Sequence, residues 1–270
     1  MGETGPVKMV ATDLDGTIVR PDGTISARSV AAFEACSRAG VFVVFVTGRP
    51  PRWMGDVAEA TGHTGTAICG NGAIVYDLGS ERVVRAQTLS PDTVRDVVKR
   101  VRDTIGDVDV GLETLEGFLR EPSYRTRWDA RADQRVGDLD ALLELAPSVV
   151  KLLVRQEGNT GDAMLAALRA PLEGLAQPTH SNVNDCLVEV SALGVSKAST
   201  LADLAAEHAI DPADVVAFGD MPNDLEMLGW AGRGYAMANG HPEVLAAADA
   251  IAPPCDEDGV AQVIEELLRG

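Results

Sequence analysis

A run of six residues, 41–46, constrains the fold more than any other stretch of this sequence. It contains only valine and phenylalanine. A continuous run of β-branched and aromatic residues is typical of a central parallel strand that is covered on both faces. A mostly apolar run at residues 7–11 predicts a second buried strand. Between the two lies a predicted helix, which begins after Ser26 and ends before Gly40. The order strand, helix, strand predicts a right-handed βαβ unit.

The same alternation continues to residue 83 and returns after residue 187. It predicts strands at 66–69, 215–218, 234–237 and 250–252, and helices at 53–61, 197–208, 224–228, 242–248 and 260–268. The middle differs: it has helices after Ser90 and at 139–145 and 162–168, strands at 108–112 and 149–154, and an irregular arginine-rich stretch up to Arg135. We therefore predict an α/β core made of residues 1–83 and 187–270, interrupted by an α+β insertion of residues 84–186.

Composition and charge narrow the classes of partner. The formal net charge is −18, which argues against nucleic acid and against anionic membranes, because both attract basic surfaces. The N-terminus has no basic segment followed by an apolar stretch, and no apolar run approaches the roughly 20 residues of a membrane helix. Four cysteines do not lie at the spacing of metal ligands, so reduced thiols and a cytoplasmic location are expected.

The first predicted strand ends in two carboxylates, Asp13 and Asp15, separated by one leucine. Residues two apart on an extended chain point the same way, so these carboxylates are expected close together where the strand ends. They would share a proton unless a cation lies between them, which points to a divalent metal with oxygen ligands. The alternative is a strand followed by an ordinary Asp-Gly turn.

Polar residues also follow other predicted core strands, or begin a helix near them. They are Thr47, Lys197, Asp220, Asn223 and Asp224. Ligands of open parallel sheets bind at the carboxyl ends of the strands, so these groups could meet. A carboxylate nucleophile, a second carboxylate as acid, a hydroxyl, an ammonium and further carboxylates for magnesium suit phosphoryl transfer. Taken singly, Thr47 could satisfy backbone groups, Lys197 could be solvated, and Asp220 and Asp224 could occupy a turn and a helix start.

The combination of motifs resembles the haloacid dehalogenase (HAD) superfamily phosphatases, of the Cof-like group with a type IIB cap. The resemblance spans nearly the whole chain. The four superfamily motifs occur in order, and a Gly70-Asn71-Gly72-Ala73 turn also matches this group. The motifs are Asp13-Leu14-Asp15-Gly16-Thr17, Val46-Thr47-Gly48-Arg49, Gly194-Val195-Ser196-Lys197 and Gly219-Asp220-Met221-Pro222-Asn223-Asp224.

This resemblance implies a role for each matching residue. Asp13 resembles the nucleophile that forms an aspartyl-phosphate, and Asp15 resembles the general acid and base. The phosphoryl group is expected to meet Thr47, Gly48, Arg49, Asn71, Lys197 and Asn223, and the catalytic set is Asp13, Asp15, Thr47 and Lys197. Mg²⁺ is expected to be held by Asp13, the Asp15 carbonyl, Asp220 and Asp224, with Asp224 acting through water or an adjacent ligand.

The implied fold is a Rossmann-like core with an inserted α+β cap, as a monomer or homodimer. The implied function is Mg²⁺-dependent hydrolysis of a small phosphomonoester, a sugar phosphate or phosphorylated cofactor. The alternatives are a phosphosugar mutase and a non-catalytic phosphometabolite-binding protein. In the cap, candidates for leaving-group selection are Lys151, His180, Ser181, Asn182 and Asn184, and Trp128 with Arg125 and Arg127 could grip an anion. Solvated loops and a packed tryptophan are the alternatives there.

Overall fold

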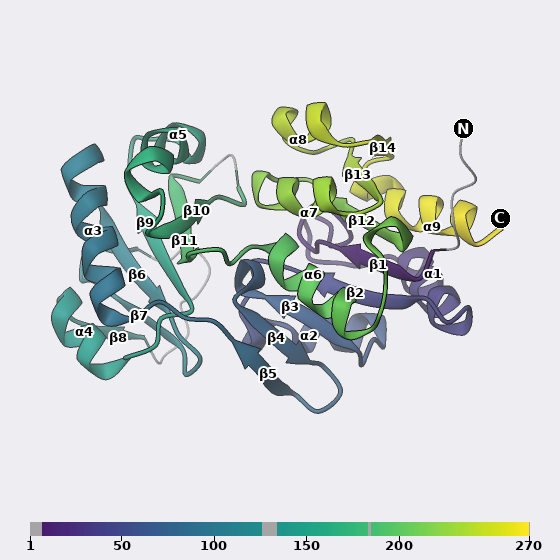
Figure 1. Cartoon of the computed structure of the whole chain (residues 1–270), viewed down its shortest axis with the longest axis horizontal. Coiled ribbons are helices and arrows are strands. Elements are labelled where there is room, and N and C mark those ends of the chain that lie inside the picture. The colour runs from purple at the N-terminus through teal and green to yellow at the C-terminus, as the bar shows by residue number, and fades with distance from the viewer. Residues whose placement is uncertain (1–6, 126–133, 183–184, 270) are drawn as a thin grey trace. The chain divides into compact units, whose positions relative to one another are not determined.

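The computed structural model of the chain describes residues 7–125, 134–182 and 185–269. It consists of two compact units (Figure 1). The first is drawn from Met1–Arg85 and Ser196–Gly270, and the second is Ala86–Val195. The chain therefore leaves the first unit once and returns to it once. Among the described residues, no helix is long and apolar enough to cross a membrane.

The first unit is built on an eight-stranded sheet with the order β14-β13-β12-β1-β2-β3-β4-β5. The strands from β14 to β3 run parallel, and β4 is antiparallel to β3. Their bounds are β1 (Met9–Thr12), β2 (Phe42–Val46), β3 (Thr66–Cys69), β4 (Ile74–Asp77), β5 (Arg82–Ala86), β12 (Val215–Gly219), β13 (Arg233–Met237) and β14 (Ala250–Ala252).

The register of the central strands places their carboxyl ends at one edge of the sheet. Thr12, the last residue of β1, is opposite Phe45 on β2 and Phe218 on β12. All of β1 and β12 is buried, as the apolar runs predict for central parallel strands. Residues that directly follow β1, β2 and β12 are consequently neighbours in space, although they are far apart in the sequence.

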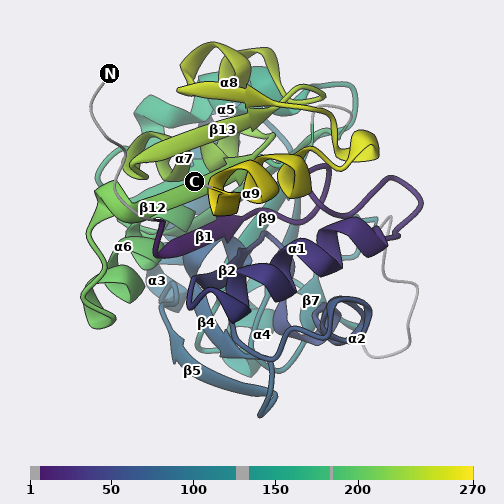
Figure 2. The ribbon, with the colours of Figure 1, turned by 90° about the vertical axis from the view of Figure 1, so that its right-hand side faces the viewer.

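Helices cover both faces of this sheet. On one face lie α6 (Lys197–Glu207), α7 (Leu225–Trp230) and α8 (Pro242–Ala247), which share an apolar cluster with side chains of β1, β2 and β12. On the other face α1 (Ala27–Arg38) lies beside α9 (Gly259–Arg269) (Figure 2). The Phe33 ring of α1 packs edge-on against Phe45, with centroids 5.4 Å apart. Ser26 caps α1 by accepting a hydrogen bond from the Ser29 amide. The short α2 (Gly55–Thr61) follows a 3-10 turn, η1 (Pro51–Trp53).

The second unit has its own six-stranded sheet, in the order β10-β11-β9-β6-β7-β8. Pairing is antiparallel except between β7 and β8. Side chains of the helices α3, α4 and α5 and of this sheet form a separate apolar core. The bounds are α3 (Pro91–Ile105), α4 (Leu139–Leu145), α5 (Gly161–Leu172), β6 (Asp109–Glu113), β7 (Phe118–Arg120), β8 (Arg135–Val136), β9 (Lys151–Arg155), β10 (Ala176–Thr179) and β11 (Leu187–Ala192).

The predicted α/β fold class with an α+β insertion is confirmed, but the second unit is residues 86–195 rather than the predicted 84–186. With the boundary predicted at residue 187, β11 would belong to the core. In the structure it pairs with β9 and β10, so it belongs to the second unit, and the first unit resumes at Ser196. Strands β7, β8 and β10 were not predicted. Each is short, and β10 includes Pro178, which removes one backbone donor.

Candidate active site

Lys197 joins two carboxylates beyond the carboxyl ends of the parallel strands. Its Nζ donates to Asp13 Oδ1 at 2.5 Å and to Asp224 Oδ1 at 2.6 Å. All three side chains are buried, with exposed fractions of 1%, 8% and 0%. Lys197 is the first residue of α6, and Ser196 caps that helix through the amide of Ser199. The cap therefore fixes the start of the helix and, with it, the origin of the lysine side chain.

Asp224 also organises the turn that follows β12. Its Oδ2 accepts hydrogen bonds from the backbone amides of Asp220 and Met221, each at 3.0 Å. A Cβ on Gly219 would lie 2.5 Å from the Asp224 side chain, so the close approach requires glycine. Both Asp224 oxygens therefore accept hydrogen bonds, and Asp224 links the Lys197 side chain to the backbone of this turn.

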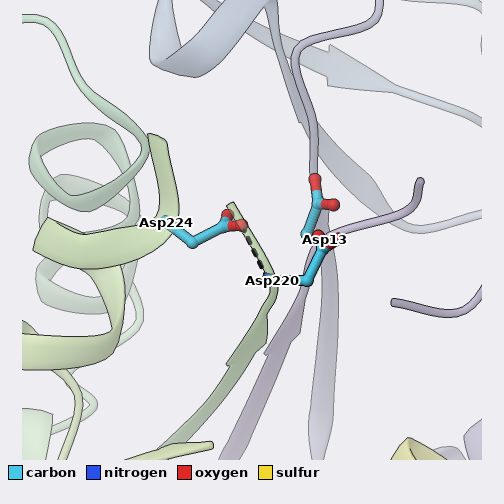
Figure 3. A group of neighbouring side chains, drawn as sticks. All are labelled: Asp13, Asp220 and Asp224. Atoms are coloured by element: carbon cyan, nitrogen blue, oxygen red, sulfur yellow. Dashed lines mark hydrogen bonds between the residues drawn. The ribbon is translucent and has the colours of Figure 1, made fainter. Parts of the chain in front are cut away.

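Asp13, Asp220 and Asp224 form a cluster of acidic side chains (Figure 3). One carboxylate oxygen from each lies within 4.8 Å of the others. Burial raises the pKa of Asp13 to about 7, and the neighbouring carboxylates of Asp224 and Asp15 add to this against the opposing effect of Lys197. Burial, followed by the charges of Asp13 and Asp224, raises the pKa of Asp220 to about 9. For Lys197, burial alone would lower the pKa, but Asp13 and Asp224 outweigh it and raise the pKa.

The cluster fits a hard divalent cation such as Mg²⁺. Such ions take oxygen ligands, and the charge of a cation would offset the burial and the neighbouring carboxylates that raise the pKa values of Asp13 and Asp220. Gly16, at φ +80°, has no side chain where a Cβ would come within 2.3 Å of Asp220 Oδ2. Thr17 Oγ1 donates to the other Asp220 oxygen at 3.3 Å. The site is therefore shaped around the Asp220 carboxylate.

The residues predicted to bind phosphate lie at the same edge of the sheet. Thr47 follows β2, is buried, and accepts the Arg49 amide at 3.0 Å, with Gly48 between them. Asn71 follows β3 in a 3-10 turn, at φ +57°, and its amide donates to the Thr47 carbonyl at 3.0 Å. Asn223 Nδ2 donates to Asn71 Oδ1 at 3.1 Å. The turns after β2, β3 and β12 are thus connected.

The Asp15 side chain does not share the buried environment of the acidic cluster. Its side chain is 59% exposed and forms two hydrogen bonds with Arg49, Nε to Oδ2 at 2.8 Å and Nη2 to Oδ1 at 2.5 Å. The hydrogen bond to Asp15 raises the pKa of Arg49 despite partial burial. The two aspartates of the first motif are therefore in different environments, one buried beside a lysine and the other held by an arginine near solvent.

Two further residues support the site and were not predicted. Thr17 was noted only as part of the first motif, and its hydroxyl contacts Asp220. Asn239 lies after β13, donates from Nδ2 to the Gly16 carbonyl at 2.8 Å, and accepts the Cys255 amide at 2.8 Å. The motif itself could have indicated Thr17. Asn239 carries no such signal, because its contact depends on how β13 aligns with β1 across the sheet.

Three candidates in the second unit bind acidic side chains of the same unit. Lys151 and Glu189 form a buried ion pair, and Ser181 Oγ donates to Glu189 at 3.1 Å. His180 Nε2 shares a 2.7 Å hydrogen bond with Asp162. Asn182 and Arg125 are exposed. Arg127, Trp128 and Asn184 lie outside the described residues.

A second buried ion pair in this unit was not predicted. Arg155 donates to both oxygens of Asp185, at 2.5 and 3.0 Å, and lies over the Tyr124 ring, 5.6 Å from its centroid. Arg155 ends β9, and alternation along that strand places it on the same face as Lys151. That face of the six-stranded sheet is therefore polar and charge-paired.

Comparison with known proteins identifies the family of this chain. A family model described as haloacid dehalogenase-like hydrolase matches residues 10–264. A haloacid dehalogenase-like hydrolase from B. subtilis has 23% identity and a TM-score of 0.82, with 97% of this chain and 100% of that one aligned. Another, from Bacteroides thetaiotaomicron, has 25% identity and a TM-score of 0.74, with 97% and 99% aligned. A subclass IIB sugar phosphatase of the HAD superfamily has 20% identity and a TM-score of 0.79, with 96% and 98% aligned. The predicted superfamily and the prediction of an enzyme are confirmed: the chain belongs to the haloacid dehalogenase-like hydrolases, and its fold is that of the phosphatases in this superfamily.

Proposed function

We propose that the chain is a Mg²⁺-dependent phosphomonoester hydrolase that works through an aspartyl-phosphate on Asp13. The observation that carries the proposal is the environment of this carboxylate, which follows a central strand and is held by Lys197 in a buried acidic cluster. Such a carboxylate suits nucleophilic attack on phosphorus, because removal from water makes it more nucleophilic and the hydrogen bond from Lys197 fixes its orientation. The four motifs that brought these residues together support the same reaction.

The first half-reaction transfers the phosphoryl group to the enzyme. The Asp13 carboxylate attacks phosphorus, the bond from phosphorus to the leaving oxygen breaks, and that oxygen takes its proton from Asp15. Lys197 and the hydroxyl of Thr47 hold phosphoryl oxygens, with the amide of Gly48 and the side chains of Asn71 and Asn223 nearby as further donors. A bound Mg²⁺, held by Asp13, Asp220 and the Asp15 carbonyl, would supply positive charge against the phosphoryl oxygens.

The second half-reaction releases phosphate. Asp15, now ionised, accepts a proton from water as that water attacks phosphorus. The bond between phosphorus and the Asp13 oxygen then breaks, which regenerates the carboxylate. Asp224 takes no direct part in either step; it holds Lys197 and the amides of the Asp220 turn in place.

The substrate is proposed to be a small phosphometabolite, a sugar phosphate or phosphorylated cofactor. The second unit, Ala86–Val195, is proposed as the type IIB cap that selects the leaving group, and its charge-paired polar face suits a polar partner. The proposed context is the cytoplasm, because the four cysteines, all among the described residues, form no disulfide. The proposed assembly is a monomer or homodimer. The net charge of −18 supports a small-molecule substrate rather than nucleic acid.

A panel of phosphomonoesters, assayed for released phosphate with Mg²⁺ and with EDTA, tests the proposal. The wild-type chain should release phosphate only with the metal, and Asp13→Asn should abolish release. Asp22→Asn is the matched control, because it makes the same substitution in an exposed turn. Release by Asp13→Asn would refute the mechanism. Dependence on a bisphosphate activator would indicate the mutase instead, and binding without turnover would indicate a binding protein.

A further inference from the structure

The backbone of Arg49 is held in place at the edge of the sheet where the candidate active site lies. Its backbone amide donates to Thr47 Oγ1 at 3.0 Å, and its carbonyl accepts from the Gly70 amide at 3.0 Å. These two bonds attach it to the end of β2 and to the turn after β3. Its backbone therefore keeps one position relative to the residues proposed to hold the phosphoryl group.

The side chain of Arg49 reaches across to Asp15, 34 residues earlier in the chain. Nε and Nη2 meet different oxygens of one carboxylate, at 2.8 and 2.5 Å. A planar guanidinium that meets both oxygens fixes the orientation of the carboxylate as well as its position. The Asp15 side chain is 59% exposed, and ion pairs near solvent contribute little to folding stability. A functional role explains this geometry better than a structural one.

We propose that Arg49 is the positioning residue for the general acid and base of this enzyme. The motif predicted that Arg49 would meet the phosphoryl group; we infer instead that it acts through Asp15. The inference rests on the proposed function, because it assumes that Asp15 moves the proton of the leaving group. None of the steps described for that function involves Arg49, so the inference adds a residue to the mechanism.

The two proton-transfer states of Asp15 use the same contact. After the leaving oxygen has taken the proton, the Asp15 carboxylate can accept both hydrogen bonds from Arg49 that the structure shows. When Asp15 carries the proton, its other oxygen still accepts one bond from Arg49. In each state Arg49 fixes the orientation of the carboxyl group, and the backbone of Arg49 is itself held by the Thr47 hydroxyl. Loss of Arg49 should therefore lower kcat/KM most for substrates whose leaving group needs a proton.

Leaving-group dependence tests this inference. Two substrates are compared with Mg²⁺: p-nitrophenyl phosphate, whose phenolate leaves without a proton, and glycerol phosphate, whose alkoxide needs one. The measured quantity is kcat/KM, which covers the steps up to release of the alcohol. Arg49→Met should lower this value for the alkyl ester by about 10 to 100-fold more than for the aryl ester, as expected when general acid catalysis is impaired. Arg49→Lys, which cannot bind both oxygens in the same way, should fall between.

Two controls separate positioning from other effects. Arg52→Met makes the same change three residues away, where the side chain lies over Trp53, and should leave the ratio of the two substrates unchanged. In an Asp15→Asn background, Arg49→Met should no longer change that ratio, because the group it positions is absent.

An equal fall for both substrates would overturn the inference, since it would mean that Arg49 grips the phosphoryl group or supports the fold. A ratio that Arg49→Met still changes in the Asp15→Asn background would also overturn it. Activity of Asp13→Asn would instead refute the proposed function, and the inference with it. An inactive Asp13→Asn together with a substrate-independent Arg49→Met would overturn the inference alone.

Discussion

Replacing Lys197 with methionine removes the ammonium that Asp13 and Asp224 share while keeping a long, unbranched side chain. The lysine is 1% exposed and lies 2.5 and 2.6 Å from the two carboxylates. Removing one partner of a buried ion pair costs about 3–5 kcal/mol, because the remaining charge is left uncompensated. We expect a loss of this size in the free energy of unfolding.

The loss should depend on pH and on metal. Without the lysine the folded carboxylates keep protons to higher pH. The cost should therefore be lower at pH 6 than at pH 8, where folding must either bury them ionised or take up protons that are scarcer in solution. Saturating Mg²⁺ should stabilise Lys197→Met more than the wild-type chain, since the cluster has gained net negative charge. An added Asp224→Asn substitution should recover part of the loss in EDTA.

Urea unfolding in EDTA, followed by tryptophan fluorescence, measures these free energies. The matched control is Lys8→Met, in which the same change removes an exposed ion pair with Asp214 and should leave the midpoint unchanged. If Lys197→Met loses no more stability than Lys8→Met, the assignment of Lys197 as the counter-charge of a buried acidic cluster is wrong.

Three other predictions concern the metal, a glycine and a helix cap. The raised pKa values of Asp13 and Asp220 mean that the metal-free folded chain binds protons more tightly than the unfolded chain, so this stabilisation is complete below about pH 4 and is lost as pH rises through about 7 and 9. The rise in Tm on adding Mg²⁺ should therefore be larger at pH 8 than at pH 6; an equal rise would contradict this. Gly16→Ala, at φ +80° and facing Asp220, should cost about 1–3 kcal/mol of strain and abolish the Mg²⁺-dependent rise in Tm; an unaltered rise would show that Asp220 does not need this space. Ser26→Ala should cost about 1 kcal/mol of stability through loss of the α1 cap without changing kcat, and an effect on kcat would mean that α1 influences the site.

The sequence predicted the part of the site that follows from local order. Asp13, Thr47 and Asp220 each come directly after a buried strand, and parallel strands bring their carboxyl ends to one edge, so all three were expected there. That they are neighbours depends on the strand order, in which β1 lies between β2 and β12. The position of β11 could not be obtained in this way. Its alternation of apolar residues suits either sheet, and only pairing with β9 and β10 assigns it to the second unit.

Side-chain partners were the least predictable feature. The pairing of Arg49 with Asp15 depends on the rotamers of two side chains from different turns, and several other partners were within reach of so long a side chain. The contact of Asn239 with the Gly16 carbonyl depends on three-dimensional alignment of strands that are not neighbours in the sequence. Both contacts were therefore visible only in the structure.

Trapping the phosphorylated enzyme tests the central claim most directly. Asp15→Asn, mixed with p-nitrophenyl phosphate and Mg²⁺, should release a burst of one p-nitrophenolate per enzyme and then turn over slowly, because the aryl group leaves unaided but water lacks its base. Acid quenching and mass spectrometry of the peptides should locate one phosphoryl group on Asp13. A burst with the phosphoryl group on another residue, or full turnover with no covalent species in Asp15→Asn, would contradict the account.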